Sequence, residues 1–150
     1  MTNKKLEFED LIEVYRPTLG RDVDVLAYRA LRCSILNFLG ITGNSKLYSA
    51  GKYFGEKLYV ESFEELVEFF KELKIGILEV IDEEPLKLRI YECANCAGLP
   101  NIGKKICCFE AGLLAGVLKN ILNKDVHVVE VKCYASGDDC CEFEVRVLED

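Results

Sequence analysis

The stretch from Cys107 to Cys141 constrains the fold of this chain more than any other segment. It holds five of the eight cysteines, distributed over a small-residue helix pattern, a valine-rich strand pattern and a final turn and strand. A helix, a strand and a hairpin that each supply thiols can bring them to one point in a folded domain, an arrangement typical of metal sites. The sequence therefore predicts a fold in which these distant segments converge.

The length and charge of the chain narrow the class of protein. A chain of 150 residues suits one domain with a single core, and we interpret residues 1–150 as such. The net charge of -7 repels phosphate backbones, so direct binding of nucleic acid is not expected. We see no signal-peptide pattern and no apolar run near the ~20 residues of a membrane span. The expected location is the cytoplasm, where reduced thiols or metal ligands are commoner than disulfides.

Hydrophobic periodicity predicts helices first and a sheet afterwards. We expect helices over 23–39, 45–58, 62–75 and 106–122, and strands over 77–81, 86–91, 128–133 and 141–147. The third helix begins with a capping box at Ser62 and Glu65. This order favours an α+β domain with an antiparallel sheet covered by helices, and argues against a doubly wound parallel sheet.

The alternation of side chains along a strand indicates which cysteines can face a common metal ion. Alternation places Cys141 on the apolar face of the last strand and Cys140 on the opposite, outward face. Glu130 and Cys133 are three residues apart and would face oppositely in a regular strand. A bulge, or an end of the strand at Lys132, is needed before both can reach one ion.

Other motifs carry weaker predictions. The loop from Gly98 to Lys105 nearly matches the sequence pattern of a phosphate-binding loop. Lys105, however, stands where that pattern needs a hydroxyl to bind magnesium, so we do not favour this interpretation. The only histidine, His127, lies among valines and is interpreted as a packing or surface residue. Glu110, within an apolar helix pattern, is interpreted as a solvated edge residue.

The spacing of the cysteine-rich stretch resembles the C-terminal half of the 4-vinyl-reductase domain. The matching positions are Cys107, Gly112, Gly116, Glu130, Cys133, Gly137, Asp138 and Cys141. That family is a small-ligand-binding module of phenol-responsive transcription activators and of stand-alone archaeal proteins, and the likeness places a motif-bearing core at about residues 17–148. The resemblance implies a structural zinc site with Cys107, Glu130, Cys133 and Cys141 as ligands.

The chain departs from the family pattern at four extra cysteines. Cys108 and Cys140 stand beside implied ligands, and Cys93 and Cys96 form an additional pair. Spacing alone would also accept a ligand set of Cys93, Cys96, Cys107 and Cys108.

The resemblance leads us to expect a non-enzymatic domain that binds a small hydrophobic molecule. The glycines of the second helix suggest a pocket between that helix and the hairpin over 77–91, lined by Tyr48, Gly51, Tyr53, Phe54 and Gly55. Plain helix packing is the commoner use of such glycines. One alternative is a protein-interaction or assembly subunit, because the family's fold resembles that of vesicle-tethering subunits; another is a thiol redox protein using Cys93 and Cys96.

We also predict a homodimer. This rests on the paired glycines of two helices, Gly51 with Gly55 and Gly112 with Gly116, and on dimeric relatives of the family.

Overall fold

The computed structural model describes residues 5–148 and shows helices stacked on one four-stranded antiparallel sheet. The elements are α1 (Phe8–Ile12), α2 (Val25–Leu39), the 3-10 turn η1 (Gly40–Thr42), α3 (Gly43–Glu56), α4 (Phe63–Glu72), β1 (Ile77–Glu83), β2 (Leu86–Tyr91), α5 (Cys108–Leu122), β3 (Val126–Lys132), the 3-10 turn η2 (Tyr134–Ser136) and β4 (Cys141–Val147). The sheet order is β1-β2-β4-β3. The predicted α+β class is confirmed.

Capping side chains start helices α2 and α4, and a glycine ends α2. The Asp24 side chain accepts a hydrogen bond from the Leu26 amide and starts α2, and Gly40 ends it with φ 64°. At α4 the Ser62 hydroxyl accepts from the Glu65 amide, as the capping box requires. The Glu65 carboxylate accepts from the Glu61 amide, one residue earlier than in a standard box.

The sheet has one apolar face and one charged face. Leu88 of β2 pairs with Phe143 of β4, and both are fully buried on the face toward the helices. On the other face, Arg89 and Glu142 form an ion pair with a 2.8 Å separation between Nε and Oε1. Alternation of side chains along the strands thus directs the core to one side of the sheet.

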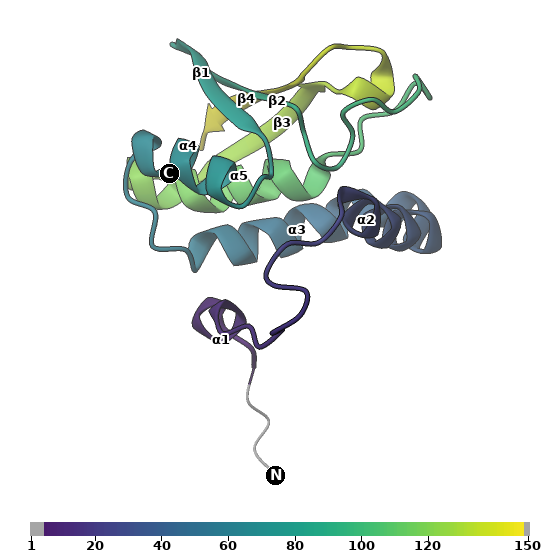
Figure 1. Cartoon of the computed structure of the whole chain (residues 1–150). Coiled ribbons are helices and arrows are strands. Elements are labelled where there is room, and N and C mark those ends of the chain that lie inside the picture. The colour runs from purple at the N-terminus through teal and green to yellow at the C-terminus, as the bar shows by residue number, and fades with distance from the viewer. Residues whose placement is uncertain (1–4, 149–150) are drawn as a thin grey trace.

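Helix α5 lies between the sheet and α3 (Figure 1). All nine residues from Glu110 to Leu118 are buried, because the sheet covers one side of this helix and α3 covers the other. A helix enclosed on both sides must be apolar almost all round, as this one is.

The α3–α5 contact brings the two backbones together through glycine. A Cβ added to Gly51 would overlap the carbonyl oxygen of Phe109, and one added to Gly112 would overlap that of Tyr48. Gly55 and Gly116 are equally confined by the facing backbone. All four glycines therefore serve close packing inside one chain. They are not a free surface for a second subunit, which corrects our reason for expecting a homodimer.

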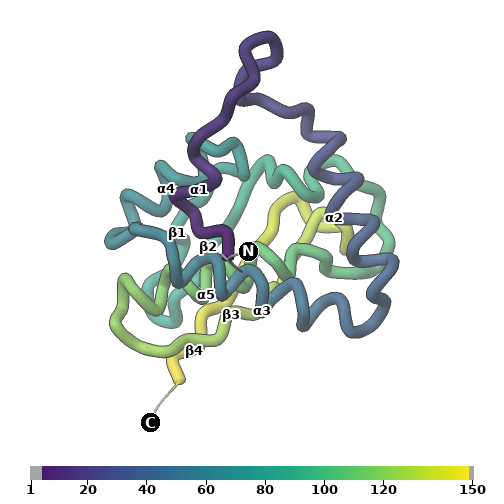
Figure 2. Tube along the Cα trace, turned by 90° about the horizontal axis from the view of Figure 1, so that it is seen from below, coloured from purple at the N-terminus to yellow at the C-terminus, as the bar shows by residue number. Residues whose placement is uncertain are grey.

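The α2 helix has an apolar side that no described residue covers. Phe38 is 90% exposed and Leu31 is 62% exposed, and both lie in a surface hollow with Ile35 and Leu39. Figure 2 shows α2 at the rim of the molecule, joined to α1 by a projecting loop. This surface is unusually apolar for one open to solvent.

The helical stretch Val25–Glu56 is long and apolar enough, by length and composition, to cross a membrane. From the sequence we expected no segment of this kind, so this candidate differs from the expectation. The chain bends at Gly40, and α3 then runs in a different direction from α2 in both views (Figures 1 and 2). The α3 half is packed on α5, so the stretch also serves as two elements of the folded domain.

Candidate functional site

Five thiols meet in the interior where the loop after β2, the start of α5, the end of β3 and the start of β4 come together. They belong to Cys93, Cys96, Cys107, Cys133 and Cys141, each 0% exposed. The Cys96 Sγ lies 3.3 Å from that of Cys107 and 3.2 Å from that of Cys141. All of the chain's cysteines are free thiols. The predicted convergence of the cysteine-rich stretch is present, with two additional thiols from the loop after β2.

Backbone hydrogen bonds form the turn that carries Cys93 and Cys96. The Cys93 carbonyl accepts from the amides of Cys96 and Ala97. The Arg29 guanidinium of α2 then donates to the carbonyls of Ala94, at 2.7 Å, and Ala97, at 2.6 Å. A cation from a distant helix therefore fixes the loop that places both thiols.

The expected irregularity in β3 brings Glu130 and Cys133 to the same side. The β3–β4 register shifts between Glu130 and Lys132, and the strand ends at Lys132. A bulge of this kind re-aims side chains, which removes the difficulty of their odd spacing. The Cys133 carbonyl accepts hydrogen bonds from the next turn, and its amide donates to the Asp138 carboxylate at 3.0 Å.

Glu130 has an incomplete set of partners. Its Oε1 accepts from the Cys107 amide at 3.1 Å, while its Oε2 is shielded from solvent and lacks a hydrogen-bond partner. Burial raises the pKa of the Glu130 carboxyl to about 9, and the nearby Cys133 thiolate adds to the rise. A cation beside Oε2 would supply the missing interaction.

The sulfur and carboxylate atoms form two overlapping groups that could hold a metal ion. One contains Cys93, Cys96, Cys107 and Cys141, and the other contains Cys107, Glu130, Cys133 and Cys141. Within each group all ligand atoms lie within 4.8 Å of one another. The second group is the set implied by the family resemblance.

The remaining cysteines lie apart from this cluster. Cys108, a member of our alternative ligand set, donates its thiol to Asn44 Oδ1 at 3.6 Å and to a backbone carbonyl, so Cys141 takes its place in that set. Cys140 is absent from both groups, as its opposite register predicts, yet it is 2% exposed rather than outward in solvent. Cys33 is exposed on α2.

A small apolar pocket lies beside the cluster, between α2, the start of α3 and the loop over 95–106. Its volume is about 210 Å³. The lining includes Leu36, Leu47, Leu99 and Ile106. Asn95 also lines it and donates to Cys107 Sγ at 3.6 Å, so pocket and thiol cluster share one loop.

Arg32, one of the residues that line this pocket, forms a buried ion pair with Glu110. The Arg32 guanidinium donates to both Glu110 oxygens, at 2.7 and 2.9 Å, and to the Tyr28 hydroxyl, which in turn donates to Glu110. Burial, followed by the Glu110 charge, raises the pKa of Tyr28. Arg32 Nε is buried without a partner. Glu110 is 1% exposed, which corrects its interpretation as a solvated residue. A carboxylate among small, apolar helix residues was the signal for this pairing.

The pocket residues expected from sequence lie elsewhere. Gly51 and Gly55 face α5, which occupies the space between α3 and the hairpin where we expected a ligand (Figure 1). The Tyr48 hydroxyl accepts from the Val128 amide and lies 3.2 Å from Nδ1 of exposed His127.

The other two expected pocket residues are also outside the cavity. Tyr53 is half exposed beneath the Lys57 ammonium, and Phe54 contacts the ring of Phe8. None of the five residues lines the pocket beside α2.

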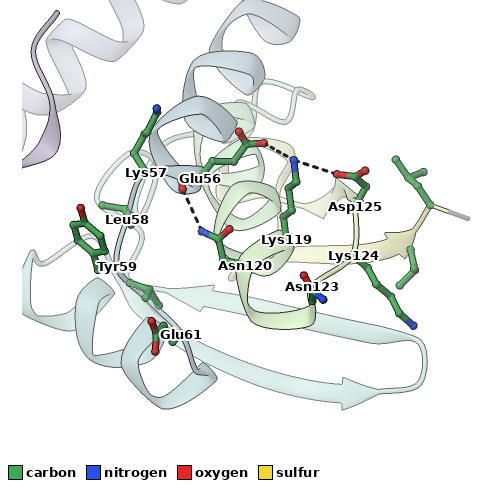
Figure 3. Close-up of a pocket in the computed structure, with 13 residues that line it drawn as sticks. Glu56, Lys57, Leu58, Tyr59, Glu61, Lys119, Asn120, Asn123, Lys124 and Asp125 are labelled. Atoms are coloured by element: carbon green, nitrogen blue, oxygen red, sulfur yellow. Dashed lines mark hydrogen bonds and ion pairs between the residues drawn. The ribbon is translucent and has the colours of Figure 1, made fainter. Parts of the chain in front are cut away.

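A second, polar hollow lies where the end of α3 meets the end of α5 (Figure 3). The Lys119 ammonium lies between the carboxylates of Glu56 and Asp125, at 3.7 and 3.4 Å, and Asn120 donates to the Glu56 carbonyl. Lys57, Glu61 and Lys124 also line this hollow, so its lining is mostly charged and polar and suits a hydrophobic molecule less well than the pocket beside α2.

Comparisons with known proteins agree with the fold. The family model of the 4-vinyl-reductase domain matches residues 86–147. An uncharacterized protein of Methanocaldococcus jannaschii is 42% identical over 132 residues, covering 87% of this chain and 82% of the relative. A second from the same organism is 37% identical over 153 residues, covering 95% and 88%.

Solved structures of other proteins also share the fold of this chain. A vinyl-4-reductase family protein from Methanocaldococcus jannaschii has a TM-score of 0.69 and 25% identity, covering 87% of this chain and 85% of that one. The phenol-responsive sensory domain of the transcription activator PoxR, solved with phenol, has a TM-score of 0.61, 13% identity, and coverage of 83% and 75%. Trafficking protein particle complex subunit 3 from Naegleria fowleri, covalently bound to palmitic acid, gives 0.58, 17%, and 83% and 93%. The last two share the fold alone. The full-length likeness to archaeal relatives and the matching C-terminal segment show that this chain belongs to the 4-vinyl-reductase domain family.

Proposed function

We propose that this protein is a non-enzymatic, cytoplasmic domain that binds a small hydrophobic molecule, as a sensor or carrier, and is stabilised by a structural zinc ion. The observation that carries the proposal is the pocket beside α2, which has a largely apolar lining and a few polar side chains, Arg32 and Asn95 among them. Sensor domains of the same fold support the binding of a small molecule, among them the one solved with phenol.

The pocket chemistry indicates the kind of ligand. Its 210 Å³ is below the roughly 300 Å³ at the lower end of drug-sized sites, so the molecule is about one ring or a short chain in size. Arg32 and Glu110 neutralise each other, and Arg29 is engaged by carbonyls. A neutral, largely apolar molecule would therefore fill this pocket without displacing the ion pair.

A pocket-filling variant tests this proposal with a matched control. Leu36→Trp places a large ring in the pocket from α2, whereas Leu31→Trp adds the same ring on the exposed side of that helix. With phenol as the probe, calorimetric titration should show at least about tenfold weaker binding for Leu36→Trp alone. Equal affinities of both variants and the parent, or no binding by any small aromatic, would contradict the proposal.

The zinc part of the proposal rests on the donors present. Cys107, Cys133, Cys141 and Glu130 supply three sulfurs and an oxygen, a closed tetrahedral set that suits a structural rather than a catalytic ion. The 3.7 Å between Cys107 and Cys141 Sγ agrees with the edge of about 3.8 Å expected for Zn–S bonds of about 2.3 Å. The orphaned Glu130 Oε2 is the group that the ion would satisfy. Metal analysis of the purified protein that finds no zinc would refute this part.

The exposed α2 surface favours a second candidate function, that of an assembly subunit. Its partner would cover Phe38, Leu31 and their neighbours, and a second copy of the chain is the partner we predict. Sedimentation should then show a dimer that Phe38→Glu dissociates. A monomer at high concentration would remove the homodimer from the proposal without affecting the pocket.

The thiol redox hypothesis is less favoured by the structure. Cys93 and Cys96 are fully buried, whereas redox-active thiols must be reached by a partner.

A further inference from the structure

We propose that the thiol cluster binds two metal ions rather than one, in a binuclear centre bridged by the sulfurs of Cys107 and Cys141. This inference rests on the proposed zinc site and assigns a role to Cys93 and Cys96, which that site leaves unused. The second ion is of the same thiolate-preferring, four-coordinate class as zinc.

The cluster holds more donors than one tetrahedral ion can bind. Five thiols and one carboxylate share the cluster, and a tetrahedral ion takes only four of them. The two sets of four have two members in common, Cys107 and Cys141. Each set is completed by its own pair, Cys93 and Cys96 in one and Glu130 and Cys133 in the other. Two tetrahedra that share an edge use all six donors, and each shared thiolate then binds both ions.

The two sulfurs common to both sets are spaced as a shared edge requires. The Sγ atoms of Cys107 and Cys141 are 3.7 Å apart, as expected for two sulfurs on one tetrahedral ion. Cys93 Sγ lies at the same distance, 3.7 Å, from Cys107 Sγ. Cys96 contacts both shared sulfurs, at 3.3 and 3.2 Å, and its Sγ also lies 3.8 Å from that of Cys133 in the other set. The pair from the loop after β2 therefore approaches the proposed bridge closely enough to complete a second tetrahedron.

A set of hydrogen bonds positions Cys93 and Cys96. Arg29 fixes the carbonyls of Ala94 and Ala97, and the Cys93 carbonyl closes the turn. Asn95 donates its amide to Cys107 Sγ, one of the proposed bridging atoms. Two thiols that only filled space in the core would not need these hydrogen bonds to fix their positions, because a free cysteine packs as a small hydrophobic residue.

The charge of the six donors also favours a second cation. If all six donors are ionised, one divalent cation leaves four negative charges in the interior, and a second reduces the excess to two. Buried charge is costly unless it is compensated, so the second ion allows Cys93 and Cys96 to bind as thiolates. Each ion that binds replaces the S–H bonds of the thiols it contacts with metal–sulfur bonds, and the displaced protons pass to the solvent.

Metal stoichiometry tests the inference on the full chain. Protein produced with added zinc and desalted should carry two zinc ions per chain by native mass spectrometry and elemental analysis. One ion per chain would overturn the binuclear centre and leave the proposed zinc site standing. No zinc would overturn both, and iron with acid-labile sulfide would replace both with an iron–sulfur cluster.

Paired variants locate the two ions. Cys93→Ser with Cys96→Ser, and separately Glu130→Gln with Cys133→Ser, should each reduce the content from two ions to one. Cys33→Ser, at an exposed cysteine on α2, is the control and should retain two. Two ions in either paired variant would contradict the assignment.

Cadmium substitution tests the bridge without relying on variants that fold. The ¹¹³Cd spectrum of the cadmium-loaded parent protein should show two resonances that are coupled to each other through the shared thiolates. A single resonance, or two uncoupled ones, would contradict the bridged centre.

Discussion

The sulfur atoms of Cys107 and Cys141 lie 3.7 Å apart although 34 residues separate them in the chain. Cys107 directly precedes α5 and Cys141 begins β4, so their contact joins the layer of helices to the sheet. Whatever occupies the cluster therefore stabilises the packing of these two layers.

Replacement of the two adjacent cysteines of β4 should have unequal effects. Cys141→Ser should lose bound metal and lower the free energy of unfolding by on the order of 3 kcal/mol or more, because its sulfur belongs to both donor groups. Cys140→Ser should keep the metal and cost less, since Cys140 belongs to neither. Elemental analysis and urea denaturation measure both, and equal losses would show that the strand register is wrong.

The glycine contact between α3 and α5 should tolerate no side chain. Gly112→Ala should destabilise the fold by about 3 kcal/mol or more, because its Cβ would overlap the Tyr48 carbonyl oxygen. Gly43→Ala is the matched control: its Cβ would meet Leu36 Cδ1 and Leu39 Cβ, each at 3.2 Å, a much looser approach than at Gly112, and alanine favours a helix. Thermal unfolding compares the two, and a mild effect at Gly112 would mean that the helices can move apart.

The buried ion pair should be costly to break and cheaper to remove. Arg32→Met leaves the Glu110 carboxylate buried without its partner and should cost about 3 to 5 kcal/mol. Arg32→Met combined with Glu110→Leu should recover part of that loss. A double-mutant cycle by urea denaturation measures the coupling, and additive losses would contradict it.

Metal-free protein should become less stable as pH rises, through Glu130. Burial raises the pKa of this carboxyl from 4.5 to about 9 in the folded state. The contribution of the neutral Glu130 carboxyl to the free energy of unfolding is therefore fully present below pH 4.5. It is lost as pH rises through about 9, at no more than about 1.4 kcal/mol per pH unit.

Glu130→Gln provides the comparison, since it removes the titrating group and retains the shape. Denaturation of both metal-free proteins at pH 6 and pH 8 should show the parent falling relative to the variant. A constant difference would contradict the shifted pKa. With metal the trend reverses, because binding requires the carboxylate and its affinity rises with pH.

The sequence predicted those parts of the site that depend on local pattern. Alternation along β4 placed Cys141 inward, and the odd spacing of Glu130 and Cys133 required the irregularity found in β3. These features follow from the two-residue period of a strand, which is visible in one segment at a time.

Other parts depend on which elements become neighbours. The pocket forms because α2 lies against the loop over 95–106, and nothing in either segment alone specifies the other. Glu110 has the same explanation: it is buried because Arg32 reaches it from 78 residues away. The glycines of α3 indicated a close approach, but not that α5 would be the approaching element.

The direct backbone contact of α3 with α5 has a mechanical consequence. At Gly51 and Gly112 no side chains separate the helices, so this junction has no rotamers to rearrange and no soft layer to compress. Helices α3 and α5 should therefore move together as one rigid unit that packs against the sheet. If ligand binding changes the shape of the protein, we expect the movement in α2 and in the loop over 95–106, because these parts of the pocket lie outside the rigid α3–α5 pair. Another molecule could detect that movement by binding to their exposed surfaces.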